Sequence, residues 1–348
     1  MSNMRLLVLL STFLVSSLGL TAPTQAENTP TMVIMDTALD TSLPEIKNNL
    51  VLEVCILEWF VCPNTKNYME GPGSATLPSS AISSNGFNHG TQMTSIAIRT
   101  YPKIKIIFLR IIGNSLSGGR LTTSDRTVYQ ALEWVLSNKD KYNIVAIGLS
   151  QSHHRLLYYT EYCPVSLRTN DIIKKLFNLG VPLFVASGNN NDKERVSWPG
   201  CVPEAMAVSA ITNNAISRYS NFDKKLSDYA AIGELRVLDA GGKLTNASGT
   251  SVSAQVMAAL WTQVRVENPQ FSFADTVTYF ERIAKRVPVG DGFLKWIDGK
   301  VVNEELLRAN LEQAGIDIDS LPRPRCSQLL IGRGNSASIQ TLLSSCRV

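Results

Sequence analysis

Residues 246–260, Asn-Ala-Ser-Gly-Thr-Ser-Val-Ser-Ala-Gln-Val-Met-Ala-Ala-Leu, decide how this chain folds. Small residues lead into Ser251, and no glycine or proline then interrupts the chain before Pro269. This pattern predicts a tight turn followed by a buried helix whose N-terminus carries Ser251. A hydroxyl at that place lies at the positive end of the helix dipole, beside unpaired backbone N–H groups. Ser251 is therefore either a helix cap, which is a common role for serine, or a nucleophile.

Around this stretch, short apolar runs alternate with segments of helical pattern. Predicted strands cover residues 31–35, 50–57, 104–112, 144–149, 182–186 and 205–211. Predicted helices start at Pro44 and cover residues 89–98, 121–136, 171–179, 273–286 and 303–313. The segment 63–88 is rich in Gly, Pro, Ser and Asn, which predicts a surface loop. The alternation indicates an α/β fold with three layers, in which helices cover both faces of a doubly wound, mostly parallel sheet.

Four polar residues lie at the positions where active sites form in such a sheet. Asp36 and Asn189 come just after predicted strands, whereas His89 and Ser251 begin predicted helices. In an open parallel sheet these ends meet at one edge. Acyl transfer needs a nucleophilic hydroxyl, an imidazole base, a carboxylate that orients the imidazole, and a donor for the oxyanion. The joint occurrence of all four is more specific than any one of them, and it indicates a serine hydrolase.

These residues stand in motifs that resemble those of the subtilisin-like serine proteases, the subtilase family. Between Met32 and Asn303 the chain carries Asp36-Thr37-Ala38, His89-Gly90-Thr91, Ser187-Gly188-Asn189 and Gly249-Thr250-Ser251. The order Asp, His, Ser is that of subtilisin. The resemblance implies a subtilisin-like fold, a catalytic triad of Asp36, His89 and Ser251, and Asn189 in the oxyanion hole. It also implies a set of residues beside the substrate side chain, namely Gly148, Leu149, Ser150, Ala186, Ser187 and Gly188.

Several positions differ from the family pattern. The usual Gly after Asp-Thr is Ala38, the Pro one turn after the serine is Gln255, and the Gly that closes that motif is Ala259. The substrate-binding strand, which usually ends in Ser-Leu-Gly, reads Gly-Leu-Ser at 148–150. Because no reacting group is lost, we expect a serine endopeptidase that hydrolyses peptide bonds through an acyl-enzyme. The alternative is a catalytically silent subtilase relative that binds peptides or proteins, and an esterase is a third hypothesis.

The first residues have the features of a secretory signal peptide. Arg5 precedes an apolar run over residues 6–20, and a more polar stretch ends at Ala26. We expect a signal peptide over residues 1–26, a subtilisin-like catalytic domain over 27–320, and a disulfide-looped tail over 321–348. No later run is apolar enough to cross a bilayer. The protein is therefore expected to be exported, either secreted or periplasmic, without a stable membrane span.

Export to an oxidising compartment favours disulfides among the six cysteines. Proximity in sequence favours Cys55–Cys62 and Cys326–Cys346, which leaves Cys163–Cys201, although other pairings stay open.

Composition gives little support to other ligands. The net charge is +4 without a basic cluster, so a nucleic-acid partner is not expected. With three histidines and no Cys-x-x-Cys pair, we expect no metal and no cofactor. The family resemblance implies one alternative, a calcium ion near Asp192 and Glu194. His153 and His154 are predicted to lie in a polar loop. The expected protein is a monomer whose partners are protein or peptide substrates.

Overall fold

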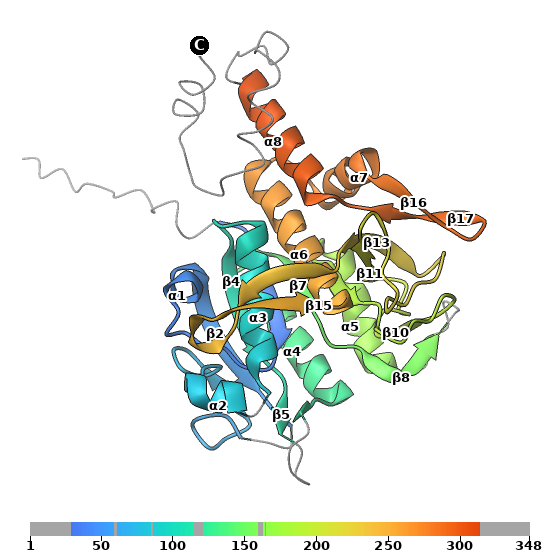
Figure 1. Cartoon of the computed structure of the whole chain (residues 1–348). Coiled ribbons are helices and arrows are strands. Elements are labelled where there is room, and N and C mark those ends of the chain that lie inside the picture. Colours follow the sequence, from blue (N-terminus) through green and yellow to red (C-terminus); the bar gives the residue numbers. More distant parts are fainter. Residues whose placement is uncertain are drawn as a thin grey trace, which may run out of the picture.

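The computed structural model describes residues 29–58, 61–84, 86–114, 121–158, 163 and 165–313 (Figure 1). The helices are α1 (Pro44–Asn49), α2 (Ser79–Ser84), α3 (Asn88–Thr100), α4 (Asp125–Asn138), α5 (Leu167–Asn178), α6 (Thr250–Glu267), α7 (Phe273–Ile283) and α8 (Gly299–Gln313). The main strands are β1 (Thr31–Asp36), β2 (Leu50–Ile56), β3 (Tyr68–Glu70), β4 (Lys105–Arg110), β7 (Ile144–Leu149), β9 (Leu183–Ala186), β11 (Ala205–Thr212), β13 (Ser227–Ile232), β16 (Lys285–Val289) and β17 (Gly292–Trp296). Three separate pairs are formed by β5 (Gly113–Asn114) with β6 (Leu121–Thr122), β8 (His153–Tyr158) with β10 (Val196–Trp198), and β14 (Glu234–Leu238) with β15 (Leu244–Ser248). The short strand β12 (Ala215–Ile216) pairs with β11.

The central sheet runs in the order β16-β17-β13-β11-β9-β7-β1-β4-β2-β3. In this order, each neighbouring pair between β17 and β2 is parallel. The pairs at the two ends, β16 with β17 and β2 with β3, are antiparallel. Asp36 lies opposite Arg110, and Met35 lies opposite Leu149. The carboxyl ends of β1, β4 and β7 therefore reach the same edge of the sheet.

Two hydrophobic cores cover the two faces of this sheet, as the alternation of side chains along a strand requires. On β1, Met32 and Ile34 join the core that contains residues of α3 and α6, whereas Val33 and Met35 join the core with residues of α4 and α5. All six residues of β1 are buried, which is typical of a parallel strand covered on both faces. The three-layer α/β fold predicted from the sequence is confirmed.

Helix α6 is the centre of one layer, and every residue from Val252 to Val264 is buried. It packs against α3 and against β7, β9 and β11. Trp261 stacks on Phe280 of α7 with the ring centroids 5.6 Å apart. A helix buried all round needs apolar or small residues on every face, and this requirement explains the uninterrupted run after Ser251.

Some local predictions were wrong. The segment 63–88 contains β3 and α2 and is not a plain loop, and His153 begins strand β8. The predicted helix 273–286 ends at Ile283, and the chain continues into strand β16. Strand β13 and the hairpin β14–β15 were not predicted. Their apolar residues are interrupted by Asp228, Glu234 and Arg236, so their pattern is weak.

Two of the expected disulfides are present, Cys55–Cys62 and Cys163–Cys201. Cys326 and Cys346, like the predicted signal peptide and tail, lie outside the described residues. Among the described helices, none combines the length and apolar character needed to cross a bilayer.

Candidate active site

Ser251 lies in the first turn of α6, at the edge where β1 and β7 end. Gly249 occupies the N-cap position with φ 141°, a conformation that favours glycine, so Ser251 does not cap the helix. The Ser251 hydroxyl donates to the backbone carbonyl of Ser150 at 3.1 Å. The hydroxyl is thus held at the end of β7. The backbone N–H of Ser251 is one of the groups that have no partner within the helix, because it lies in the first turn.

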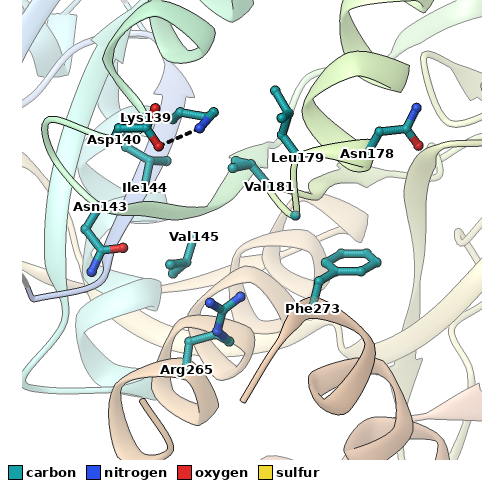
Figure 2. Close-up of a pocket in the computed structure, with 11 residues that line it drawn as sticks. Lys139, Asp140, Asn143, Ile144, Val145, Asn178, Leu179, Val181, Arg265 and Phe273 are labelled. Carbon is teal, nitrogen blue, oxygen red and sulfur yellow. Dashed lines mark hydrogen bonds and ion pairs between the residues drawn. The ribbon is translucent and has the colours of Figure 1, made fainter. Parts of the chain in front are cut away.

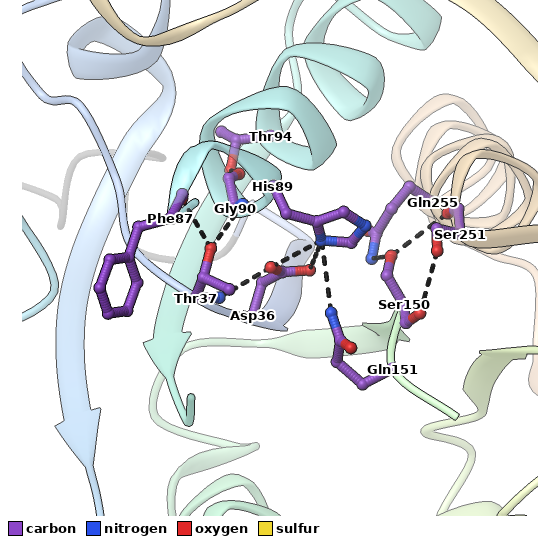
Figure 3. Close-up of polar contacts among 10 residues, drawn as sticks. All are labelled: Asp36, Thr37, Phe87, His89, Gly90, Thr94, Ser150, Gln151, Ser251 and Gln255. Atoms are coloured by element: carbon purple, nitrogen blue, oxygen red, sulfur yellow. Dashed lines mark hydrogen bonds and ion pairs between the residues drawn. The ribbon is translucent and has the colours of Figure 1, made fainter. Parts of the chain in front are cut away.

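Asp36 and His89 form a close pair beside this hydroxyl. Nδ1 of His89 lies 2.8 and 2.9 Å from the two carboxylate oxygens of Asp36. The Asp36 side chain is fully buried, whereas the His89 side chain is 31% exposed. Figure 3 shows the imidazole between Asp36 and Ser251. The order carboxylate, imidazole, hydroxyl is therefore present in space as well as in sequence.

Thr37 fixes the start of α3 to the end of β1. Its backbone N–H donates to Oδ1 of Asp36 at 2.7 Å, and its hydroxyl donates to the Phe87 carbonyl at 2.8 Å. The same hydroxyl accepts the backbone N–H of Gly90 at 2.8 Å. A side chain at position 90 would meet the carbonyl oxygen of Ala38 at 2.4 Å. The close approach of helix and strand requires glycine there, and it sets the position of His89.

The pKa of the His89 imidazole is raised above its ordinary value of 6.5. Burial of the ring lowers this pKa, but the negative charge of Asp36 and the hydrogen bond to it raise the pKa by more. The pair thus favours the imidazolium, the form that His89 takes after it accepts a proton.

Asn189 follows β9 and is oriented by Thr250. Its Oδ1 accepts both the backbone N–H and the hydroxyl of Thr250, each at 2.9 Å. The carbonyl end of the amide is therefore engaged by the helix start. The Nδ2 end is left to donate to a ligand, and the residue is exposed.

A small cavity of about 180 Å³ adjoins these groups. It is lined by Ser150, Gln151, Ser152, Ala186, Asn189, Asn190, Thr250 and Ser251. Of the six residues expected beside a substrate, the structure brings Ser150 and Ala186 to this cavity. The remaining four, Gly148, Leu149, Ser187 and Gly188, are not among its lining residues.

Two glutamines near the site were not predicted as functional residues. Nε2 of Gln151 lies 3.4 Å from Nδ1 of His89. Gln255 is fully buried in α6, and its Nε2 donates to the Ser150 hydroxyl at 2.8 Å. The available signal for Gln255 was a polar residue inside an apolar helix, because such groups are buried only with a partner.

The residues proposed for calcium do not fit an ion. The Asp192 carboxylate is bound by the Arg195 side chain at 2.8 Å and by the backbone N–H of Glu194 at 3.1 Å. The positive charge of Arg195 thus already neutralises the carboxylate, and a cation there would need further oxygen ligands. Within the described ranges, no three His, Cys, Asp or Glu side chains gather in a way that could hold a metal.

A larger cavity of about 550 Å³ lies at the opposite edge of the sheet (Figure 2). Its lining includes Ile144, where β7 begins, and Arg265 near the end of α6. Since β7 ends beside Ser251 and begins at this cavity, the two hollows are separated by the length of the strand. The larger cavity is therefore not part of the site around Ser251.

Comparison with known proteins agrees with this geometry. The model of the subtilase family matches residues 28–293. A cuticle-degrading serine protease of Arthrobotrys oligospora is 28% identical over 185 residues, which are 51% of this chain and 41% of that protein. A subtilisin-like protease of Coccidioides posadasii is 30% identical over 206 residues, 56% of this chain and 47% of that protein. The matched region thus spans less than half the length of these two relatives.

Solved structures show the same fold at low identity. A cold-adapted subtilisin-like serine proteinase superposes with a TM-score of 0.58 and 18% identity, over 78% of this chain and 90% of that one. A lanthipeptide protease superposes with a TM-score of 0.61 and 15% identity, over 81% of this chain and 90% of that one. The family match covers well over half of the sequence, and the fold and the motifs agree with it. The chain belongs to the subtilase family.

Proposed function

We propose that this chain is an exported serine endopeptidase that hydrolyses peptide bonds through Asp36, His89 and Ser251. The observation that carries the proposal is the Asp36–His89 pair, with Nδ1 at 2.8 and 2.9 Å from the carboxylate, at the same sheet edge as the Ser251 hydroxyl. A hydroxyl that only stabilised a helix would need neither an imidazole nor a buried carboxylate beside it.

In the first half of the reaction, Ser251 Oγ attacks the peptide carbonyl carbon while Nε2 of His89 accepts its proton. Asp36 keeps Nδ1 protonated and stabilises the imidazolium. The negative oxygen of the tetrahedral intermediate is held by Nδ2 of Asn189 and the backbone N–H of Ser251. His89 then gives its proton to the leaving amine, and the carbon–nitrogen bond breaks to leave an acyl ester on Ser251.

The second half repeats these steps with water. His89 takes a proton from the water as its oxygen attacks the ester carbonyl, and the same donors hold the new oxyanion. The proton then passes to Ser251 Oγ as the ester bond breaks, which releases the carboxylic acid and restores the enzyme.

The cavity beside Ser251 supports a preference for uncharged side chains. All its lining residues are Ser, Thr, Asn, Gln or Ala. A charged substrate side chain would lose water there without gaining an opposite charge, which is costly. We propose that the residue before the cleaved bond is neutral and small enough for a volume of about 180 Å³.

Export is supported by the signal-peptide pattern over residues 1–26 and by the two disulfides, which form in oxidising compartments. Protein or peptide substrates follow from the proposed reaction, and a monomer suffices for it because one chain supplies every reacting group.

The test is cleavage of denatured casein and of a peptide library, mapped by mass spectrometry. We expect the purified wild-type protein to cut after neutral residues. Replacement of the nucleophile in Ser251→Ala should reduce the rate by roughly 10⁶-fold, the loss that this change causes in a related subtilisin. Ser253→Ala is the matched control, because Ser253 lies on the same helix and donates to Ala231 and Ile232 of β13.

The main alternative is a catalytically silent relative that binds peptides. It is favoured by one observation, namely that the Ser251 hydroxyl donates to Ser150 and not to His89. This hypothesis predicts that wild type binds library peptides without cutting them, and that Ser251→Ala binds them equally well. Turnover of simple esters without any peptide cleavage would instead favour an esterase.

A further inference from the structure

Gln255 is a buried amide one helical turn after Ser251. Its side chain is fully buried, and its Nε2 donates to Ser150 Oγ at 2.8 Å (Figure 3). A Cβ atom at position 148 would lie 2.3 Å from Oε1 of Gln255. The amide therefore occupies the space that a side chain at Gly148 would fill.

Ser150 joins this amide to Ser251 by two further hydrogen bonds. Its hydroxyl donates to the Ser251 carbonyl at 3.2 Å, and its own carbonyl accepts the Ser251 hydroxyl at 3.1 Å. A serine hydroxyl has one proton, and here Ser251 receives it. The lone pairs of Ser150 Oγ are thus left for Gln255. Gln255 Nε2 donates to Ser150 Oγ, which donates to the Ser251 carbonyl, and the Ser251 hydroxyl donates back to the Ser150 carbonyl.

Three departures from the family pattern meet in this chain of contacts. The family has Ser, Gly and Pro where this sequence has Gly148, Ser150 and Gln255. A serine at 148 would collide with the amide, and a glycine at 150 would leave Nε2 of Gln255 buried without an acceptor. The three residues therefore fit together in this arrangement, in which Gly148 leaves room for the amide and Ser150 accepts its Nε2.

We infer that Gln255 is a positioning residue that acts through Ser150 on the Ser251 hydroxyl. This inference rests on the proposed function. The amide fixes the end of β7 against α6, and with it the position of the Ser150 carbonyl that accepts the Ser251 hydroxyl. In the reaction this hydroxyl turns its proton from Ser150 to Nε2 of His89. Since Gln255 does not line the cavity, its loss should lower kcat and leave KM unchanged.

The experiment is a double-mutant cycle on the full chain, read as the rate of covalent labelling by a fluorophosphonate. Gln255→Met removes the donor and keeps the length of the side chain. We expect it to label roughly three- to tenfold more slowly than wild type, the factor that one neutral hydrogen bond provides. Ser150→Ala should slow labelling by a similar factor, and the double variant should be no slower than the slower single variant.

Gln263→Met is the matched control, because Gln263 is another buried amide of α6 and donates to Asn303 Oδ1 at 2.8 Å. It should lower the melting temperature without slowing the labelling. If Gln255→Met does not fold, Gln255→Asn, which draws the amide back from Ser150, should show the same slowing.

Labelling of the Gln255 variant at the wild-type rate, or losses that multiply in the double variant, would overturn the positioning role while the proposed function stands. A wild-type chain that takes no label would overturn the proposed function, and the positioning role with it.

Discussion

The two sides of Ser251 are built by different means. On one side, the Asp36 carboxylate and the His89 imidazole lie 2.8 Å apart, and Thr37 fixes β1 and α3 through hydrogen bonds to the side chain of Asp36 and to the start of α3. On the other side, Ser150 contacts Ser251 and Gln255 contacts Ser150, in each case through uncharged hydrogen bonds. The first side agrees with the family pattern at its reacting residues, whereas the second departs from it.

The difference shows which residues around Ser251 the proposed reaction requires and which can be replaced by others. The imidazole gains and loses a charge during the reaction, so its partner has to be a carboxylate. Ser150 and Gln255 keep the same charge throughout the reaction, so several neutral arrangements could hold the Ser251 hydroxyl in place. Substitutions on the first side should therefore have much larger effects than those on the second.

The largest effect that separates the two sides is expected for Asp36→Asn. Loss of the carboxylate removes the charge that stabilises the imidazolium and the acceptor that keeps Nδ1 protonated. By analogy with another serine protease fold, kcat should fall about 10⁴-fold. Steady-state kinetics on a fluorogenic peptide would measure it. A loss no larger than that of Gln255→Met would contradict the distinction between the two sides.

A smaller loss is expected for Asn189→Ala. Its amide is oriented by Thr250, and truncation removes one of the two proposed oxyanion donors. The expected reduction in kcat is roughly 10²- to 10³-fold, a range that comes from the corresponding change in a subtilisin. The value of KM should stay close to that of wild type. A large rise in KM with kcat unchanged would place Asn189 in substrate binding instead.

The pH dependence gives the smallest but most selective effect. His89 must be neutral to accept a proton, and Asp36 raises its pKa above 6.5, so kcat/KM should fall on acidification with a midpoint above 6.5. Asp36→Asn removes the raising charge and should move this midpoint to lower pH. Gln255→Met should leave it in place, because an uncharged group does not stabilise the imidazolium. An equal shift of the midpoint in Asp36→Asn and Gln255→Met would contradict the distinction between the two sides of Ser251.

The sequence was sufficient to bring Asp36 and His89 to one edge and to predict the buried strands from β2 to β11 in the order of the sheet. Runs such as residues 144–149 are apolar throughout, which predicts buried parallel strands, and the triad residues stand in short local motifs. The second side depends on contacts between Ser150 and Gln255, which are 105 residues apart. Nothing in the local pattern around either residue specifies that pairing. The sequence therefore showed Gln255, Gly148 and Ser150 as differences from the family pattern, without indicating that they contact one another.

The same reasoning explains the errors in the fold. Strand β13 is completed by neighbours on both sides, β11 and β17, so its own apolar pattern need not be strong. The alternative role of Ser251 as a helix cap is excluded by the local backbone. Gly249 supplies the positive φ of the turn and takes the N-cap position, which leaves the serine hydroxyl free for another role.

The central claim is that Ser251 is a nucleophile activated by His89 and Asp36. Its most direct test is to treat the purified wild-type protein with a fluorophosphonate and to locate the adduct by peptide mass spectrometry. The account predicts one adduct, on Ser251, that is absent from Ser251→Ala and forms far more slowly in Asp36→Asn. An adduct on another residue, or no adduct on a folded wild-type chain with its disulfides intact, would contradict it.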